Sequence, residues 1–199
     1  MKLLHLVAPI SIVATALGSG VQASAEPAIV VSIADQKLAL VEDGTPVAQF
    51  PVSTSKFGVG DRLGSYATPL GTLEIASKIG ANAPLGAVFK SRIQTGEILR
   101  PNAHGRDPIV TRIIWLRGLE RRNARAYDRG IYIHGTPVER LIGRPASYGC
   151  IRMRSRDVAH LFNAVTVGTR IAVVRCHLRD AITRASDGAL RTELGFASN

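Results

Sequence analysis

Residues 131–136 read IYIHGT and residues 146–152 read ASYGCIR, and these two stretches decide both the fold and the chemistry expected of the chain. The first alternates in the manner of a strand and carries His134 near its end. The second places Cys150 directly after Gly149, in a chain that has only two cysteines. Such a cysteine is one half of a disulfide, a buried structural thiol or a nucleophile, and the surrounding sequence decides among the three.

The N-terminus has the pattern of a secretory signal peptide. Lys2 gives a basic start, an apolar stretch covers residues 3–17, and Ala23-Ser24-Ala25 is the small-residue pattern that signal peptidase recognises. The apolar stretch is shorter than the ~20 residues that a membrane-spanning helix needs. We therefore expect a signal peptide over residues 1–25, no stable membrane span after its cleavage, and a periplasmic or secreted protein associated with the cell wall.

The chain is strongly basic, with 25 Lys and Arg against 15 Asp and Glu and a formal net charge of +10 at pH 7. Inside a cell, such a charge favours nucleic acid as the partner. Export argues against nucleic acid, as does the scatter of the arginines along the whole sequence. A polyanionic surface outside the membrane, such as the cell wall, is the expected partner, with simple solubility as the alternative explanation of the charge.

Short apolar runs separated by turn signals predict a mostly β protein. Asp43-Gly44 is a strong hairpin signal between two of these runs. One helix is predicted after the cysteine, because Ser155 is a suitable N-cap and an apolar stripe at helical spacing follows it as far as Gly168. Residues 80–105 show no period and are expected to form an irregular loop, which in compact domains often serves as a lid. The predicted strands are 29–33, 37–41, 47–52, 72–76, 109–116, 131–134 and 170–175.

These elements predict a simple domain organisation. The chain that remains after signal cleavage is long enough for one domain with a hydrophobic core. We expect a single domain of β-sandwich type, mostly β with one or two helices, over residues 26–178. A polar tail follows over residues 179–199.

His134 and Cys150 together have the composition of a nucleophilic site. A cysteine nucleophile acts as the thiolate, and a neighbouring imidazole can lower the thiol pKa from ~8.5 by forming an ion pair with it. The base must itself be oriented, and the backbone carbonyl of Gly135 is a candidate acceptor for its other ring nitrogen. Gly149 permits a tight turn before the nucleophile, and the amides of Gly149 and Cys150 are candidate donors of an oxyanion hole.

The same residues resemble the signature of the YkuD-type L,D-transpeptidases. In that family a histidine is followed, at a characteristic interval, by Ser/Thr-His-Gly-Cys, an apolar residue, and Asn or Arg. Here His134-Gly135 is followed by SYGCIR at residues 147–152. The segment TPLGTL at residues 68–73 also resembles the family's Thr-Pro-x-Gly-x-Phe. The likeness extends over roughly residues 29–174, including the opening hairpin.

The resemblance implies a mechanism that needs no metal and no cofactor. Cys150 would attack the amide after the L-centre of diaminopimelate in a peptidoglycan tetrapeptide stem, expel the terminal D-Ala and leave a thioester on the enzyme. His134 would take the thiol proton and pass it to the leaving amine. The amine of a second stem would then resolve the thioester as a 3→3 cross-link. Other members of the family use the lysine of a wall-attached lipoprotein as the acceptor, or admit water and act as carboxypeptidases.

The chain departs from the family at Tyr148, where the family usually has histidine. A phenol titrates near ~10 and is a poor base at neutral pH, so the expected role of Tyr148 is to donate a hydrogen bond or to shape the pocket. Arg152 either grips a substrate carboxylate or braces the loop through an ion pair. Ser147 and Tyr132 are candidate substrate-binding residues, with a loop hydrogen bond and simple packing as their respective alternatives.

Two other classes of protein remain as alternatives. NlpC/P60-type and papain-like peptidases place the cysteine before the histidine in the chain, whereas here His134 precedes Cys150, which goes against that class. A non-catalytic wall-binding domain would instead join Cys150 to Cys176 in a disulfide, as exported proteins often do. In the catalytic interpretation, Cys176 is a buried structural thiol.

Overall fold

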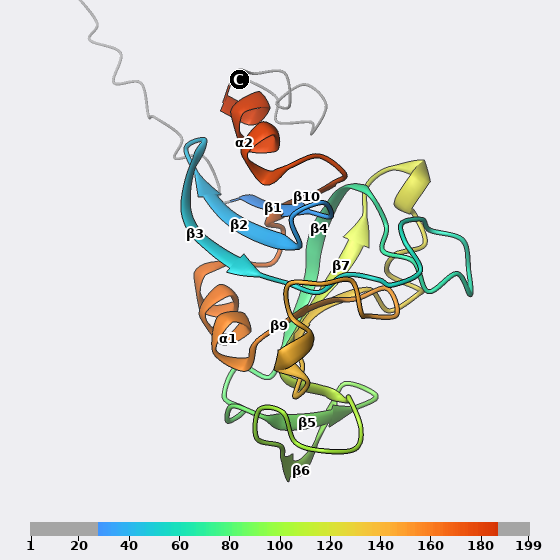
Figure 1. Ribbon diagram of the computed structural model, residues 1–199, viewed down its shortest axis with the longest axis vertical. Coiled ribbons are helices and arrows are strands. Elements are labelled where there is room, and N and C mark those ends of the chain that lie inside the picture. The colour runs from blue at the N-terminus through green and yellow to red at the C-terminus, as the bar shows by residue number, and fades with distance from the viewer. Residues whose placement is uncertain (1–27, 187–199) are drawn as a thin grey trace, which may run out of the picture.

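The computed structural model describes residues 28–186, so the predicted signal peptide and residues 187–199 of the predicted tail lie outside the described residues. Within this range the chain is mostly β, with two α-helices, α1 (Ser155–Ala164) and α2 (Leu178–Ser186) (Figure 1). Two short 3-10 helices, Arg121–Asn123 and Glu139–Leu141, lie in the connections. The predicted fold class, mostly β with one or two helices, is confirmed.

The strands form one mixed sheet that branches at β7. The main path runs β3-β2-β1-β10-β4-β7-β5-β6, and β8 pairs with β7 on one side and β9 on the other. Only the β1–β10 and β8–β9 pairs are parallel. The strands of the described residues are β1 (Ala28–Ser32), β2 (Lys37–Glu42), β3 (Thr45–Pro51), β4 (Gly71–Ile79), β5 (Ala87–Lys90), β6 (Ile93–Ile98), β7 (Ile109–Gly118), β8 (Tyr132–Gly135), β9 (Ile151–Met153) and β10 (Arg170–Val174).

Each of the seven strands predicted from apolar runs is present, with ends that differ by a few residues. The hairpin signal is also confirmed, because Asp43 and Gly44 have φ values of 48° and 77° and join the antiparallel strands β2 and β3. Two consecutive residues with positive φ are what the commonest two-residue hairpin turn requires.

The irregular loop predicted over residues 80–105 is wrong in part, because that stretch contains the β5–β6 hairpin. All six residues of β6 are exposed, so their side chains have no buried face to impose an alternating pattern on the sequence. Gly96, with φ of 88°, interrupts the strand further. Strand β9, which the sequence did not predict, is only three residues long.

Helix α1 begins one residue earlier than the predicted cap implies. Ser155 is its first residue and Arg154 is the N-cap, without a capping side-chain bond. The amide of Ser155 instead donates to the carboxylate of Glu139 at 2.9 Å, and its hydroxyl accepts from Thr111 at 2.9 Å. Serine was therefore the wrong cap because a carboxylate distant in the sequence satisfies the helix terminus.

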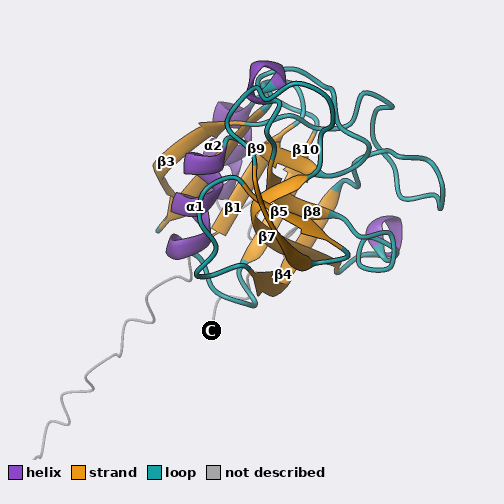
Figure 2. Cartoon of the chain, turned by 90° about the horizontal axis from the view of Figure 1, so that it is seen from below, coloured by secondary structure: helices purple, strands orange, loops and turns teal. Residues whose placement is uncertain are grey.

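One hydrophobic core lies between the arms of the sheet and α1. Side chains of β1, β2, β4 and β10 meet those of β7, β8 and β9 there, as in a sandwich closed at one side by the helix. Figure 2 shows the strands in the middle of the molecule, with long loops extending on the side away from α1. The largest fully buried side chains are Ile29, Leu38, Leu73, Ile75, Ile113, Ile114, Leu116, Ile133, Ile151, Met153, Leu161 and Ile171.

Helix α2 belongs to the folded unit. Leu178, Ala181 and Ile182 are buried against apolar side chains of β1 and β2. The predicted boundary between residues 178 and 179 therefore falls at the start of a helix that packs on the sheet. Within the described residues, no helix combines the length and the apolar character needed to cross a membrane.

Candidate active site

The parallel pairing of β8 and β9 brings the two quoted stretches of sequence together. In this pair Ile133 lies opposite Ile151, and His134 lies opposite Arg152. The two isoleucines point into the core, so the alternation of strands sends His134 and Arg152 to the other face. Cys150 comes two residues before Arg152, immediately before β9, and packs in a cluster on that face. The histidine and the cysteine are therefore diagonal neighbours on two adjacent strands.

His134 is buried and its orientation is fixed by the neighbouring carbonyl. Its Nδ1 lies 2.8 Å from the carbonyl oxygen of Gly135, which can only accept, so Nδ1 carries the proton and Nε2 is left with a free lone pair. Burial lowers the pKa of His134 to about 4, helped by the charge of Arg152 and opposed by the Gly135 bond and by Asp107. At neutral pH the imidazole is therefore uncharged and able to accept a proton.

Cys150 is half-buried and its sulfur donates to the carbonyl of Gly130 at 3.4 Å. Burial raises the pKa of Cys150 to about 11, while the backbone amide of Tyr132 and the charges of Arg152 and Arg129 act in the opposite direction. The thiol is therefore protonated at neutral pH. Both members of the pair rest in their neutral forms, whereas the sequence had suggested a thiolate with an imidazolium.

Hydrogen bonds hold the loop before the cysteine in one shape. The hydroxyl of Ser147 donates to the carbonyl of Cys150 at 2.6 Å and accepts from the amide of Gly149 at 3.3 Å. Thr68, from the TPLGTL segment, donates to the carbonyl of Gly149 at 3.0 Å. Gly149 has a φ of +117°, and a Cβ there would lie 3.3 Å from the carbonyl oxygen of Ala67, so the turn requires glycine.

These contacts bear on two predicted roles. Ser147 is buried and bonded within the loop, which is the loop-bracing alternative of its two interpretations. Because the amide of Gly149 is engaged by Ser147, the amide of Cys150 is the stronger candidate for an oxyanion donor. The oxyanion role of Gly149 stays a prediction.

The side chain of Arg152 is occupied by protein groups. It forms an ion pair with Asp107 and donates to the hydroxyl of Ser53 at 3.3 Å, while Asp107 also accepts from Thr136 at 2.5 Å. This arrangement is the bracing alternative, and a substrate-binding role for Arg152 stays a prediction. Sequence reasoning missed Asp107, because it lies 45 positions from Arg152, at the end of the stretch that shows no period.

We expect Asp107→Asn to destabilise the protein by about 1–3 kcal/mol, because it leaves the buried guanidinium of Arg152 without its counter-charge. The side chain of Arg152 is only 6% exposed and that of Asp107 is 33% exposed. Glu97→Gln is the matched control, since its partner Arg106 is 60% exposed and surface pairs contribute about 0–1 kcal/mol. Urea unfolding of both variants measures the difference. Equal losses of stability would contradict the bracing role of the Asp107–Arg152 pair.

A bulge in β7 makes glycine necessary after the histidine. The register between β7 and β8 shifts between Val110 and Ile113, and Thr111 in the bulge has a φ of 73°, unusual for a β-branched residue. The bulged backbone comes so close to Gly135 that a Cβ there would lie 2.6 Å from the carbonyl oxygen of Val110. The bulge and Gly135 together position the carbonyl that orients His134.

Gly135→Ala is therefore expected to cost about 1–3 kcal/mol of stability and to slow any reaction that uses His134 as the base, because either the β7 backbone or the β8 carbonyl has to shift. Gly143→Ala is the control: its φ is +93°, but a Cβ there meets nothing within 4 Å. Urea unfolding and the acylation rate are the two measurements. A Gly135→Ala protein with wild-type values in both would show that the close approach has no consequence.

The two tyrosines among the predicted site residues lie in different environments. Tyr132 is 8% exposed and packs edge-on against Trp115, with ring centroids 5.6 Å apart, so its side chain belongs to the packed cluster beside Cys150. Tyr148 is 60% exposed and reaches outward from the loop. Their predicted roles in binding and orientation stay predictions.

The disulfide alternative is wrong for this structure. Both cysteines of the chain fall within the described residues and both are free. Cys150 packs in the cluster around Phe89 and Tyr132, whereas Cys176 packs in the separate cluster under α2. The two thiols therefore belong to different parts of the core.

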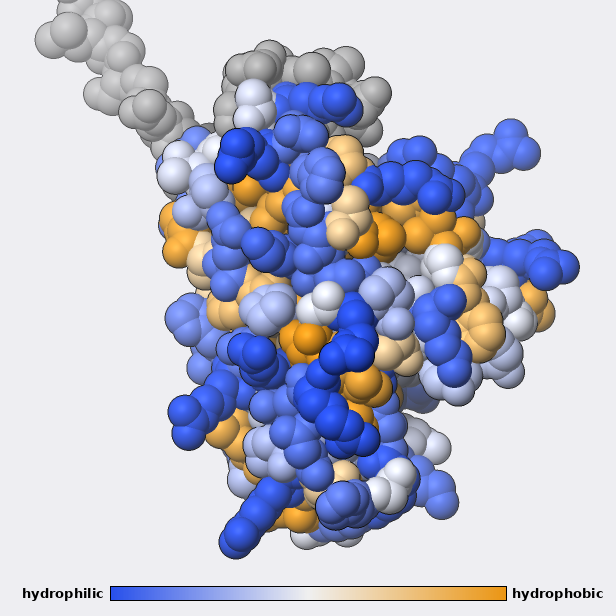
Figure 3. Space-filling view, viewed as in Figure 1, coloured by the Kyte–Doolittle hydropathy of each residue, from blue (hydrophilic) through white to orange (hydrophobic). Residues whose placement is uncertain are grey.

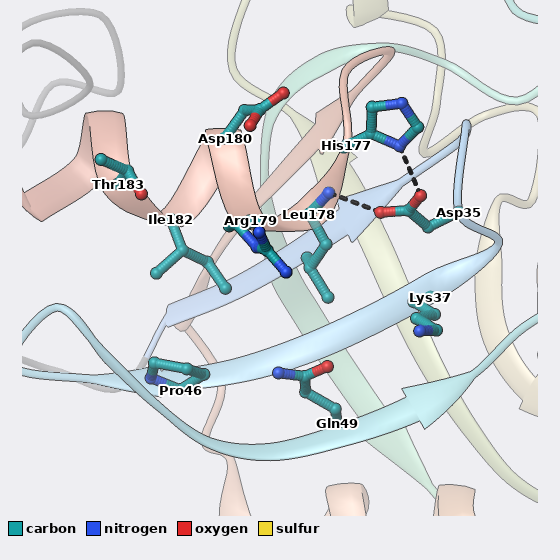
Figure 4. A pocket seen from close by; sticks show the side chains of 10 residues that line it. All are labelled: Asp35, Lys37, Pro46, Gln49, His177, Leu178, Arg179, Asp180, Ile182 and Thr183. Carbon is teal, nitrogen blue, oxygen red and sulfur yellow. Dashed lines mark hydrogen bonds and ion pairs between the residues drawn. The ribbon is translucent and has the colours of Figure 1, made fainter.

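A cavity of about 580 Å³ lies elsewhere, between α2 and the β2–β3 edge of the sheet. His177 Nδ1 lies 2.6 Å from a carboxylate oxygen of Asp35, whose other oxygen accepts from the amide of Leu178 at 2.6 Å (Figure 4). Asp35 raises the pKa of His177, and this ion pair ties the start of α2 to the β1–β2 turn. The cavity contains none of the site residues predicted from the sequence; it is lined by Asp35, Lys37, Pro46, Gln49, His177, Leu178, Arg179, Asp180, Ile182 and Thr183.

Comparison with known proteins identifies the likeness behind this arrangement. The family model described as the YkuD L,D-transpeptidase catalytic domain matches residues 26–173. The chain is similar to YqjB of Bacillus subtilis, a candidate L,D-transpeptidase, with 46% identity over 52 residues that make up 26% of this chain and 30% of that protein. It is also similar to ErfK/SrfK of Escherichia coli, another candidate L,D-transpeptidase, with 48% identity over 42 residues, 21% of this chain and 14% of that protein.

Among solved structures, an L,D-transpeptidase from Xylanimonas cellulosilytica has a similar fold, with a TM-score of 0.50 and 20% sequence identity. The likeness covers 77% of this chain and 62% of that one. The matched segments span less than one third of the length of YqjB and ErfK/SrfK. The structural likeness, at this level of identity, shows the fold alone.

Proposed function

Since the chain belongs to the L,D-transpeptidase catalytic domain family, we propose that it is a peptidoglycan L,D-transpeptidase with Cys150 as the nucleophile and His134 as the general base. The observation that carries the proposal is the placement of these two side chains on one face of the β8–β9 pair. The imidazole there is uncharged and its Nδ1 is held by Gly135, which leaves Nε2 to accept the thiol proton.

The first half of the reaction forms a thioester. The sulfur of Cys150 attacks the carbonyl carbon of the amide that joins diaminopimelate to the terminal D-Ala, and the thiol proton passes to Nε2 of His134. Because both groups start neutral, this transfer accompanies the attack rather than preceding it. The C–N bond then breaks, His134 returns the proton to the leaving amine, and D-Ala departs.

The second half transfers the acyl group to an amine. His134, neutral again, takes a proton from the acceptor amine as that amine attacks the thioester carbonyl. The C–S bond breaks and Cys150 recovers its proton. The amine belongs to a second peptidoglycan stem, which gives a 3→3 cross-link, or to the lysine of a wall-attached lipoprotein. The basic character of the chain suits the anionic surface on which these acceptors lie.

Export is part of the same proposal. Residues 1–25 direct the chain out of the cytoplasm and are removed after Ala25, and the folded unit that follows acts in the periplasm or at the wall. Intact-mass measurement of the protein from the periplasmic fraction of an expressing bacterium tests this. A mass that retains residues 1–25 would refute cleavage.

Incubation of the purified protein with tetrapeptide muropeptides tests the reaction, with products identified by mass. A dimer that has lost one D-Ala is the expected product. A tripeptide without a dimer would mean that water is the acceptor and the protein is a carboxypeptidase. Unchanged substrate, together with no mass added to the protein, would overturn the enzymatic proposal.

A further inference from the structure

Three aromatic side chains form an exposed cluster beside the cysteine loop. Phe57, Tyr66 and Tyr148 are 50%, 56% and 60% exposed, and their ring centroids lie 5.4–5.9 Å from one another. On the face drawn in Figure 3, apolar side chains form patches separated by hydrophilic ones. The chain has one Trp, four Tyr and five Phe, so three of its ten aromatic residues gather at this single exposed place. Such clustering at a surface usually marks a binding site.

The backbone is held in a strained conformation to present one of these rings. Tyr66 has a φ of 52°, in the left-handed region that a bulky residue rarely adopts. The hydroxyl of Ser55 donates to the carbonyl of Tyr66 at 2.5 Å and fixes this conformation. The exposure of the Tyr66 ring is thus a built feature of the loop rather than the consequence of a flexible tip.

Lys56 adds a charged, polar edge to the three rings, and we call the four residues Lys56, Phe57, Tyr66 and Tyr148 the aromatic platform. The Nζ of Lys56 donates to the hydroxyl of Tyr148 at 2.9 Å and lies 4.4 Å from the centroid of that ring. An ammonium group has three N–H donors, so Lys56 can hold Tyr148 and still donate to a ligand. The platform therefore offers aromatic faces and hydrogen-bond donors side by side.

The platform borders the proposed nucleophile. Tyr148 precedes Cys150 by two residues, and the amide of Lys56 donates to the carbonyl of Ser147 at 3.1 Å. At Gly149, a Cβ would lie 3.5 Å from the carbonyl oxygen of Tyr66. The loop that carries the rings and the loop that carries the thiol are thus packed together. A molecule bound at Cys150 extends over the platform if it is large enough.

We propose that the aromatic platform is a carbohydrate subsite, which binds an N-acetylated amino-sugar ring of the glycan that carries the peptide stem. The inference rests on the proposed function, in which Cys150 acts on that stem. A sugar ring has an apolar face of C–H groups, which stacks on aromatic rings, and an edge of hydroxyl and acetamido oxygens, which accept from Lys56 and the tyrosine hydroxyls. A cationic ligand fits less well, since Lys56 already lies over the ring of Tyr148.

A comparison of two substrates tests the subsite. The rate of acylation is measured on a tetrapeptide attached to its disaccharide and on the same tetrapeptide without sugar. We expect wild type to show a lower KM for the disaccharide form, by about tenfold, with a similar kcat. Phe57→Ala and Tyr148→Ala are expected to bring the ratio of the two KM values close to one. Leu63→Ala is the matched control, because Leu63 is 70% exposed and lies outside the platform; it should keep the wild-type ratio.

A binding measurement that needs no turnover separates this inference from the proposed function. The peptide-free disaccharide is titrated into Cys150→Ala protein and followed by NMR of the aromatic side chains. Shifts confined to the platform rings, lost in the Phe57→Ala background, are expected. Acylation without any sugar preference and without such shifts would overturn the subsite and leave the transpeptidase proposal standing. Shifts in a protein that forms no thioester would support the subsite and refute the nucleophile. An equal loss on both substrates in Phe57→Ala would mean that the rings contact the peptide, which also overturns the carbohydrate assignment.

Discussion

Cys150→Ala is expected to abolish formation of the acyl-enzyme and to leave the fold intact. The proposed reaction makes a covalent bond to this sulfur, and alanine has no group that can replace it. The fold should survive because the contacts that hold the loop come from other atoms. The carbonyl of Cys150 accepts from Ser147, and the neighbouring carbonyl of Gly149 accepts from Thr68. Only the weak S–H bond to Gly130 is lost.

The second cysteine of the chain provides the control. Cys176 is also half-buried, and it packs under α2 in a different cluster from Cys150. Intact-mass analysis after incubation with a tetrapeptide muropeptide should show the acyl adduct on wild type and on Cys176→Ala, and none on Cys150→Ala. Circular dichroism of all three proteins checks the fold. An adduct on folded Cys150→Ala protein would refute the assignment of the nucleophile.

Much of the fold could be predicted from the sequence, because most strands have one buried face. In β2, Leu38 and Leu40 point into the main core and Lys37 begins the strand at its exposed end, which produces the apolar run. The β2–β3 turn could be predicted because positive φ limits the residues that it accepts. Strand β6 could not, since it exposes every residue, and β9 is too short for any period to be visible.

The candidate site could be predicted only as far as neighbours in sequence determine it. His134, Gly149 and Cys150 lie in short local patterns, whose spacing was sufficient to nominate them. The ion pair of Asp107 with Arg152 depends on the fold, as does the meeting of Phe57 with Tyr148, because pairing of distant segments brings these side chains together. The pKa values depend on burial, and for that reason the sequence suggested an ion pair where both groups are neutral.

His134→Asn is expected to slow acylation by about 10²–10⁴-fold, which is the usual contribution of a general base. Asparagine keeps an N–H group near the position of Nδ1, so it can still donate to the carbonyl of Gly135, but it has no basic nitrogen in place of Nε2. His160→Asn is the control, because His160 is an exposed histidine on α1. Single-turnover acylation of a tetrapeptide measures the rates. A His134→Asn protein that acylates as fast as His160→Asn would refute the role of base.

The same substitution should change how stability depends on pH. Burial lowers the pKa of His134 from 6.5 to about 4, so between these values the unfolded chain binds a proton at this residue and the folded chain does not. The free energy of unfolding should therefore fall as the pH is lowered from about 6.5 to about 4, by up to about 3 kcal/mol from this histidine alone. His134→Asn lacks this titration, so its stability should decline less over the same interval. Other groups titrate alike in both proteins and cancel in the difference. Urea unfolding of wild type and variant at pH 7 and pH 4.5 measures it, and parallel pH dependences would mean that the imidazole is not held neutral by burial, which the proposed base requires.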